Sequence, residues 1–166
     1  MPDFTIVRSA RDLHAGDYIS WPTHGAPWHH YAIVVDVTRG SRVKVIHVVG
    51  GGTDFSALAS STSCCRCGWV EQIIDLDKPI RNGNLRHYNY LPRDCITFAM
   101  VVENSRSRLV KCDYDTFCNN CEHFARWCKI GNHTSHQGLS FAICMHILAV
   151  AYRPNWNRKW ISVTVA

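Results

Sequence analysis

Three residues that lie far apart in the sequence, Cys121, His30 and His47, have the chemistry of a thiol-dependent catalyst. A cysteine nucleophile needs a nearby base to take its proton, and histidine is the side chain most often used for this. A second histidine can orient the first and fix which ring nitrogen carries the proton. Whether these residues can act together depends on the elements that carry them.

Cys121 is predicted to be the first residue of a helix over residues 120–130. Asn120 is a good N-cap, because its side-chain oxygen can accept from amides of the first turn, and Gly131 stands where helices commonly end. The positive end of the helix dipole favours a thiolate at the first position, so we expect a lowered pKa for the Cys121 thiol. From this helix alone, a buried cysteine that only fills space remains an open alternative.

The two histidines lie on two predicted strands. His30 opens a strand over residues 30–37, and His47 lies late in a strand over residues 42–49. A hairpin with the two-residue turn Arg39–Gly40 puts both imidazoles on one face of the sheet, as diagonal neighbours about 7–8 Å apart. A slip of one residue in the register would separate them. Each histidine could also be a purely structural residue of its strand.

The remaining elements complete the fold class. Further strands are predicted at residues 17–21 and 69–76, and a second helix is predicted at residues 92–104 with Ile96, Ala99, Met100 and Glu103 on one face. Residues 1–16 are predicted as a loop, and residues 77–92 are mixed, with a turn at RNGN (81–84). Strands in the first half of the chain and helices in the second half favour an α+β domain.

Composition narrows the class of protein. The chain has 166 residues, of which 46% are hydrophobic and 19% charged, which is typical of one globular domain. The net charge of +5 favours anionic surfaces such as membranes, but the basic residues are scattered, so we expect no nucleic-acid partner. Nine cysteines behind an N-terminus without a secretory signal indicate free thiols in a reducing, cytoplasmic compartment.

The last part of the chain has a different character. Residues 134–152 contain no Asp, Glu, Lys or Arg, and residues 138–152 are strongly apolar. Basic and tryptophan residues follow, which suits contact with lipid headgroups. We therefore expect a catalytic domain over residues 1–133 and a C-terminal segment over residues 134–166 that could anchor the protein to a membrane. A buried helix of the domain is the alternative for this segment.

Five stretches, taken in order, resemble the lecithin–retinol acyltransferase family, and within it the small phospholipase A/acyltransferases related to the H-Ras-like suppressor proteins. The stretches are AGDYISW (15–21), HYAIVV (30–35), VIHV (45–48), LPRDCITFAMVVEN (91–104) and YDTFCNNCEHFARWCKIG (114–131). The resemblance spans about residues 12–131. Its most specific part is the Asn-Cys-Glu-His-Phe motif at residues 120–124.

The resemblance implies a permuted papain-like fold, with an antiparallel sheet carrying His30 and His47 packed against the helix that opens with Cys121. It implies that Cys121 is the nucleophile, that His30 is the general base and acid, and that His47 orients His30. Such enzymes move an acyl chain from a glycerophospholipid through an acyl-cysteine to water, an amine or an alcohol. They work at membrane surfaces and need no metal or cofactor. The second oxyanion donor is not assigned; the Tyr31 side chain is one candidate.

Three alternatives remain open. Cys65, Cys67, Cys118 and Cys121 could together bind zinc. Cys118 and Cys121 could form a redox Cys-x-x-Cys pair at a helix start. The chain could also keep the family fold as a binding protein without turnover. Cys64, Cys65, Cys67 and Cys118 depart from the family pattern, and the insertion typical of retinol acyltransferases is absent, so retinol is not the expected acceptor.

Overall fold

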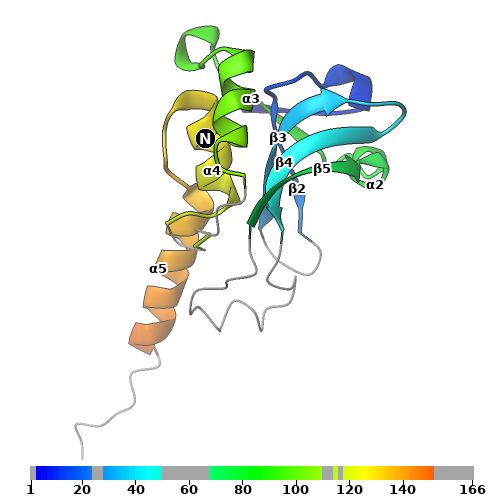
Figure 1. Cartoon of the computed structure of the whole chain (residues 1–166). Helices are drawn as coiled ribbons and strands as arrows, with labels where there is room; N and C mark the ends of the chain where they lie inside the picture. The colour runs from blue at the N-terminus through cyan, green and yellow to red at the C-terminus, as the bar shows by residue number, and fades with distance from the viewer. Residues whose placement is uncertain (1–2, 24–27, 50–67, 110–113, 116–117, 152–166) are drawn as a thin grey trace, which may run out of the picture.

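A single antiparallel sheet forms the centre of the molecule. The computed structural model describes residues 3–23, 28–49, 68–109, 114–115 and 118–151. Its six strands follow the order β1-β6-β2-β3-β4-β5 (Figure 1). The strands are β1 (Asp3–Ile6), β2 (Tyr18–Pro22), β3 (His29–Val37), β4 (Arg42–Val49), β5 (Gly68–Asp75) and β6 (Arg86–Asn89). The helices are α2 (Asp77–Arg81), α3 (Phe98–Arg106), α4 (Cys121–Ile130) and α5 (His136–Ala151), with short 3-10 helices η1 (Ala10–Asp12) and η2 (Pro92–Asp94).

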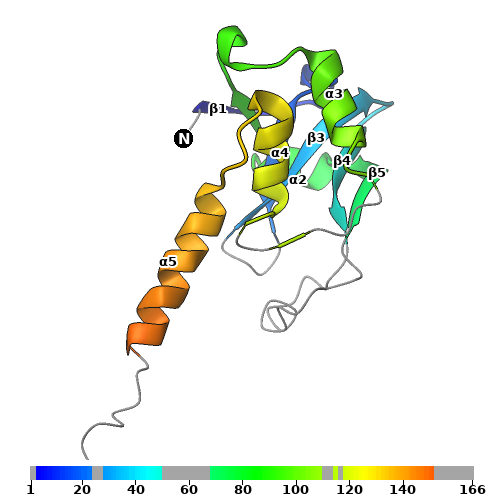
Figure 2. The same ribbon diagram turned by 60° about the vertical axis from the view of Figure 1, so that its left-hand side comes forward.

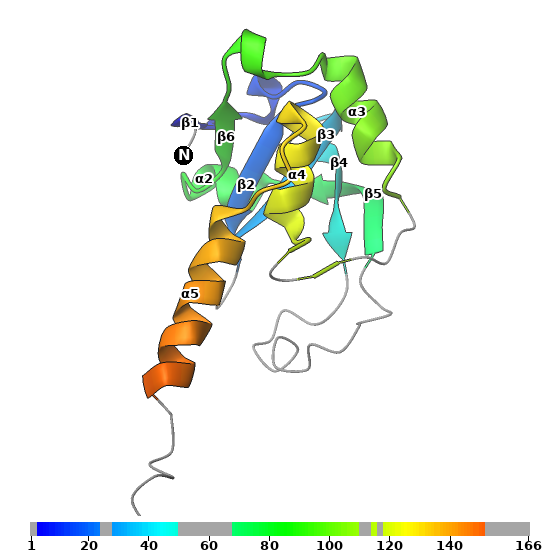
Figure 3. The same cartoon turned by 90° about the vertical axis from the view of Figure 1, so that its left-hand side faces the viewer.

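The central strand β3 is buried on both faces, which explains why its sequence does not alternate between apolar and polar residues. On one face, Tyr31 and Ile33 pack with residues of α3 and α4, such as Phe124. On the other face, Ala32 and Val34 pack with the N-terminal segment and the residues around α2. Figure 3 shows α4 lying across the sheet, with α3 beside it. The predicted α+β class, with an antiparallel sheet packed against the cysteine helix, is confirmed.

The β3–β4 hairpin differs from its prediction at the turn. The Thr38 N–H donates to the Arg42 carbonyl at 3.1 Å, so the turn is one residue longer than the predicted two-residue turn. A β-bulge between Val34 and Asp36 adds one residue to β3, and beyond it the predicted pairing returns. The two one-residue shifts cancel, so His30 and His47 still share a face. The bulge, and not an even-numbered turn, sets this arrangement.

The helix predicted over residues 92–104 is also corrected. Residues 92–94 form the separate 3-10 turn η2, and α3 begins only after Thr97, whose hydroxyl accepts from the Met100 N–H at 3.4 Å. The buried residues of α3 are Val101 and Ser105, whereas Met100 is half exposed. The predicted face was wrong because the helix starts later and turns a different side to the sheet.

Strand β1 lies where a loop was predicted, and α2 and β6 lie in the stretch predicted as mixed. β1 pairs with β6 from Asp3 opposite Asn89 to Ile6 opposite Arg86, and β6 also pairs with β2. Both strands have four residues and mix polar with apolar side chains, so their pattern alone does not distinguish them from loops. Only the pairing between distant parts of the chain makes them strands.

Helix α5 leads away from the sheet in all three views (Figures 1, 2 and 3). Its 16 residues include no acidic or basic residue, and no side of it is distinctly polar. Five of its large apolar side chains are about half exposed or more: Leu139, Ile143, Met145, Ile147 and Leu148. Within the described residues, none of the helices combines the length and apolarity needed to cross a membrane. Because the five named side chains are exposed, the alternative of a helix buried in the domain is wrong for these residues.

Candidate active site

The start of α4 is held by the cap that the sequence predicted. The Asn120 Oδ1 accepts from the N–H groups of Glu122 and His123 at 3.0 and 3.1 Å. In return, His123 Nδ1 accepts from the Asn120 N–H at 3.3 Å, which completes a capping box. Gly131 ends the helix with φ = 71°, a left-handed conformation that favours glycine. Cys121 is thus the first helical residue, as predicted.

The two predicted histidines are in direct contact. His30 Nε2 and His47 Nδ1 are 2.9 Å apart, and the two rings meet edge to face. The other nitrogen of His47, Nε2, lies 3.3 Å from the Gln72 Oε1 on β5. The Trp21 ring packs on His30 with their centroids 5.0 Å apart. The sequence had no signal for Gln72, because only the β4–β5 pairing brings it beside His47.

Cys121 and the two imidazoles approach β3 from different sides. By strand alternation, His30 and His47 share the face of Ala32 and Val45, whereas Cys121 belongs to the core on the opposite face. The Cys121 Sγ meets the strand at its backbone: it lies 3.9 Å from the His29 carbonyl oxygen. The thiol therefore donates to a carbonyl in this structure, beside His30 in the chain.

Two backbone groups of β3 flank the sulfur. They are the His29 carbonyl and the Tyr31 N–H, which is hydrogen-bonded to the Cys121 sulfur. The pairing of β3 with β4 begins further along, at Ile33 opposite Ile46. The sulfur thus occupies the place that a neighbouring strand fills elsewhere in the sheet. This gap between the two strands brings the helix start to the backbone of the histidine strand.

The thiol is less acidic than the sequence predicted. Burial raises the pKa of Cys121 to about 11, and the adjacent Glu122 carboxyl adds to the rise. The N–H groups of Tyr31 and of the helix start act in the opposite direction but do not outweigh burial. The expected lowering of this pKa was wrong, because the dipole effect of one helix end is smaller than the desolvation of a fully buried thiolate.

The histidines are held neutral. Burial, followed by the neighbouring His47, lowers the pKa of His30 from 6.5 to about 4. Burial also lowers the pKa of His47, against a smaller opposing effect of its Gln72 hydrogen bond. The resting site thus holds a neutral thiol and two neutral imidazoles at pH 7. Neutral imidazole is the form that can accept a proton.

The Tyr31 side chain belongs to the same core cluster as Cys121. Its ring is buried, 5.6 Å from the ring of Tyr18 and 5.9 Å from that of Tyr88, and its hydroxyl bonds to Tyr88. The role of this side chain as an oxyanion donor stays a prediction. The backbone N–H of the same residue, together with that of Cys121, points to the position next to the sulfur.

A buried polar network joins the cysteine helix to α5. The Ser135 hydroxyl donates to the Glu122 Oε2 at 2.7 Å and accepts from Asn120 Nδ2 at 3.2 Å and the Gly138 N–H at 2.8 Å. The same Glu122 oxygen accepts from the Gln137 N–H at 2.8 Å.

The network also reaches the histidine strand. Gln137 Oε1 accepts from the His29 N–H at 2.9 Å, one residue before His30. We call Asn120, Glu122, Ser135, Gln137 and Gly138 the α4–α5 joint. This joint was not predicted, although Ser135 before an apolar helix is a recognisable N-cap signal.

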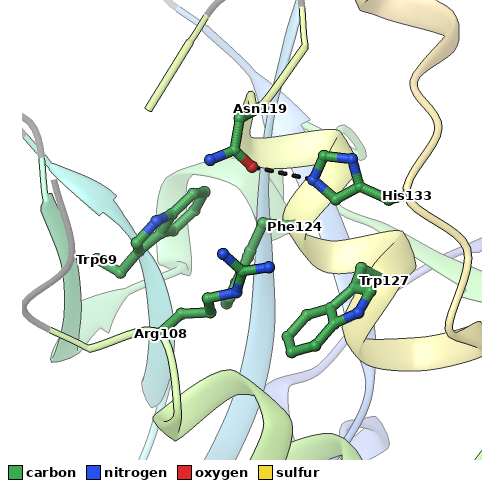
Figure 4. A pocket seen from close by; sticks show the side chains of 6 residues that line it. All are labelled: Trp69, Arg108, Asn119, Phe124, Trp127 and His133. Carbon is green, nitrogen blue, oxygen red and sulfur yellow. Dashed lines mark hydrogen bonds between the residues drawn. The ribbon is translucent and has the colours of Figure 1, made fainter. Parts of the chain in front are cut away.

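The opposite side of α4 is closed by aromatic packing (Figure 4). The crevice there is lined by Trp69, Arg108, Asn119, Phe124, Trp127 and His133. The Trp69 and Phe124 rings stack at 4.1 Å, and the Arg108 guanidinium lies 4.6 Å from the Trp127 ring centroid. Asn119 Oδ1 and His133 Nε2 are 3.0 Å apart, which fixes the residue before the cap. This crevice supports the helix start and leaves little free space.

The other cysteines do not gather around Cys121. Cys118 is exposed and its sulfur donates to Asp115 at 3.0 Å, while Cys121 is buried and turned toward β3. Cys64, Cys65 and Cys67, on which the zinc alternative depends, lie outside the described residues. Among the residues that are described, no three His, Cys, Asp or Glu side chains come together as a metal site.

Comparison with known proteins adds one positive finding. A search of curated proteins found no match. A family model described as "Lecithin retinol acyltransferase" matches residues 11–134, which is most of the chain and includes Cys121, both histidines and the cap of α4. The observed order, in which the histidine strands precede the cysteine helix, agrees with the papain-like fold that the resemblance implied. The chain belongs to the lecithin retinol acyltransferase family.

Proposed function

We propose that the chain is a thiol-dependent acyl hydrolase or acyltransferase that takes acyl chains from glycerophospholipids through an acyl-cysteine on Cys121. The observation that carries this proposal is the neutral His30–His47 pair, 2.9 Å between nitrogens, on the strand whose backbone holds the Cys121 sulfur. Membership of the family supports an acyl-transfer chemistry of this general type. Within the family, the small phospholipase A/acyltransferases are the proposed relatives.

The hydrogen bonds of the two imidazoles suggest which nitrogen acts as the base. Gln72 presents an oxygen to His47 Nε2, so that nitrogen carries the proton and His47 Nδ1 is an acceptor. His30 must then donate from Nε2, which leaves a lone pair on its Nδ1. His30 is thus the proposed base, and His47 and Gln72 are positioning residues. Gln72→Leu is expected to lower turnover about tenfold, with a changed pH profile.

The proposed reaction has two halves. When substrate binds, the thiol must leave the His29 carbonyl and reach the His30 ring past the edge of β3, because the two groups lie on different faces of the strand in this structure. His30 Nδ1 then takes its proton, and the sulfur attacks the ester carbonyl carbon. The tetrahedral oxygen accepts from the N–H groups of Tyr31 and Cys121. The ester C–O bond then breaks, the proton passes from His30 to the departing lysophospholipid oxygen, and an acyl thioester remains. Water, an amine or an alcohol then gives its proton to His30, takes the acyl group and regenerates the thiol.

Because both pKa values oppose charge separation, His30 must remove the proton during attack rather than beforehand. A free thiolate–imidazolium pair is disfavoured by a Cys121 pKa of about 11 and a His30 pKa of about 4. The substrate ester would replace water at the sulfur and supply the carbonyl that makes proton removal productive. The base therefore acts in concert with bond formation.

We propose that α5 associates with the membrane that carries the substrate. Its exposed apolar side chains, Leu139, Ile143, Met145, Ile147 and Leu148, suit contact with acyl chains rather than with water. The free state of the described cysteines agrees with a cytoplasmic membrane surface. The division into a catalytic domain, residues 1–133, and a membrane-associating segment, residues 134–166, is part of this proposal.

The test is intact-mass analysis after incubation with phosphatidylcholine vesicles. Wild type is expected to gain one acyl group on Cys121 and to release fatty acid, whereas Cys121→Ser releases none above background. Cys118→Ser, which changes an exposed thiol on the same segment, is the matched control and should retain both properties. Absence of any adduct or turnover with several phospholipids would instead support a binding protein that keeps the fold. Equal loss in both variants together with bound zinc would support the zinc alternative.

A further inference from the structure

A pocket outside the thiol site is lined in part by two residues that carry buried polar atoms. It has a volume of about 410 Å³ and is lined by Asp3, Asn89, Tyr90, Leu91, Asp94, Arg126 and His136. The Tyr90 hydroxyl and the Arg126 Nε and Nη1 atoms are buried, and none of the three has a hydrogen-bond partner among the described residues. Buried polar atoms are nearly always paired in folded proteins, so three together need an explanation.

The charge of Arg126 is only weakly balanced. Its side chain is 12% exposed, and among the described carboxylates Glu122 is the one within ion-pair distance, at 4.0 Å from Nη1. The other oxygen of Glu122, Oε2, accepts from Ser135 and from the Gln137 N–H, so this carboxylate is shared between Arg126 and the α4–α5 joint. A buried guanidinium with unused N–H groups is costly unless an anion can approach it.

We propose that this pocket binds a phosphate group, held by the Arg126 guanidinium, the Tyr90 hydroxyl and the His136 imidazole. A guanidinium offers a planar fork of N–H donors that matches phosphate oxygens, and a phenol adds a further donor. Phosphate oxygens would supply the acceptors that the Tyr90 hydroxyl and the Arg126 N–H groups lack among the described residues.

The two acidic residues of the pocket narrow the chemical class of the ligand. Asp3 and Asp94 are exposed, and Asp94 lies 3.8 Å from Arg93, a pair too exposed to neutralise it fully. A carboxylate beside a phosphate site repels a free dianion but attracts a cation attached to the phosphate. The pocket thus fits a phosphodiester that also carries an amine or quaternary ammonium group, as in a zwitterionic lipid headgroup.

The pocket is close to the thiol site along the protein. Arg126 follows Cys121 on α4 by about one and a half turns, roughly 7–8 Å along the axis. His136 begins α5, immediately before Gln137 of the α4–α5 joint. If the proposed phospholipid activity holds, this pocket would receive the headgroup while the ester lies at Cys121. The phosphate site itself does not depend on that activity.

The experiment measures binding of two soluble probes, inorganic phosphate and glycerophosphocholine, to the full chain by phosphorus NMR. Neither probe has an acyl ester, so the result is independent of turnover. We expect both to bind wild type and Cys121→Ser equally, and Arg126→Gln to bind each about tenfold more weakly or worse. Tyr90→Phe should weaken binding less. Arg81→Gln, which changes an exposed arginine on α2, is the matched control and should bind as wild type.

The order of the two probes identifies the source of the phosphate. Tighter binding of glycerophosphocholine assigns the site to a lipid headgroup, and tighter binding of inorganic phosphate assigns it to a free phosphate. Unchanged binding in Arg126→Gln, or no binding of either probe to wild type, would overturn the proposal. Thermal unfolding of Arg126→Gln shows whether the variant folds, and it should be as stable as wild type because an unbalanced buried charge is removed. If Cys121→Ser is inactive but still binds both probes, phosphate binding in the pocket does not depend on the proposed reaction.

Discussion

Helices α4 and α5 meet at the α4–α5 joint but bury their apolar residues in opposite ways. In α4, Phe124, Ala125 and Cys128 are almost fully buried against the sheet. In α5, Leu139 and Ile147 are 61% and 60% exposed. The apolar face of α4 is covered within the domain, whereas α5 is apolar all round and keeps large apolar side chains exposed, which is the basis for proposing that it meets a membrane. The thiol site thus lies on α4, inside the domain, whereas the element proposed to contact the substrate membrane is α5.

The largest expected effect concerns the base. His30→Gln should lower turnover on phosphatidylcholine vesicles on the order of 10³-fold, because His30 is the proposed base for the thiol proton. Vesicle binding, which depends on α5, should not change. Fatty-acid release and vesicle co-sedimentation measure the two properties separately. His14→Gln is the control, since this histidine is largely exposed. A loss of less than about tenfold would remove His30 from the mechanism.

The second effect is on the pH dependence of domain stability. The pKa of His30 is lowered to about 4 in the folded protein, so the unfolded state takes up a proton first as the pH falls below about 6.5. His30 therefore stabilises the fold above pH 6.5, and this contribution, about 3 kcal/mol, is lost between pH 6.5 and 4. Denaturant unfolding across this range measures the slope. His30→Gln should reduce the slope of the unfolding free energy against pH. An equally steep slope in that variant would show that His30 is not the group responsible.

Third, apolar residues of α5 should govern membrane binding without affecting the thiol site. Changing Leu139, Ile143 and Ile147 together to serine removes exposed apolar surface and should weaken vesicle binding about hundredfold. Acylation of Cys121 by a soluble thioester should continue. Ile73→Ser, an exposed apolar residue on β5, is the control. Undiminished vesicle binding in the triple variant would mean that α5 has a different partner.

The smallest effect tests the α4–α5 joint. Ser135→Ala removes one hydrogen bond each from Glu122, Asn120 and the Gly138 N–H inside a buried network, which should cost about 1–3 kcal/mol. The melting temperature should fall by about 2–4 °C per kcal/mol. Ser140→Ala, on the exposed surface of α5, should have no effect. If Ser135→Ala melts like wild type, the two helices are not coupled through this hydroxyl.

Much of the site followed from residue type and local pattern. The cap at Asn120, the helix start at Cys121 and the glycine end were predicted correctly because they depend on neighbours within one turn. The shared face of His30 and His47 was predicted, although for an incomplete reason. The α+β class and the family were also present in the sequence, since ordered motifs preserve both.

Other features needed the tertiary structure because they depend on residues that are distant in sequence. The bulge in β3 is what preserves the histidine register, and pairing of β4 with β5 is what brings Gln72 to His47. The sign of the Cys121 pKa shift reversed, because burial by the whole fold exceeds the effect of one helix end. Local sequence thus determined the chemical groups and the helix that carries the thiol. Only packing determined their solvation, their partners and the exposure of α5, since these are properties of contacts between elements.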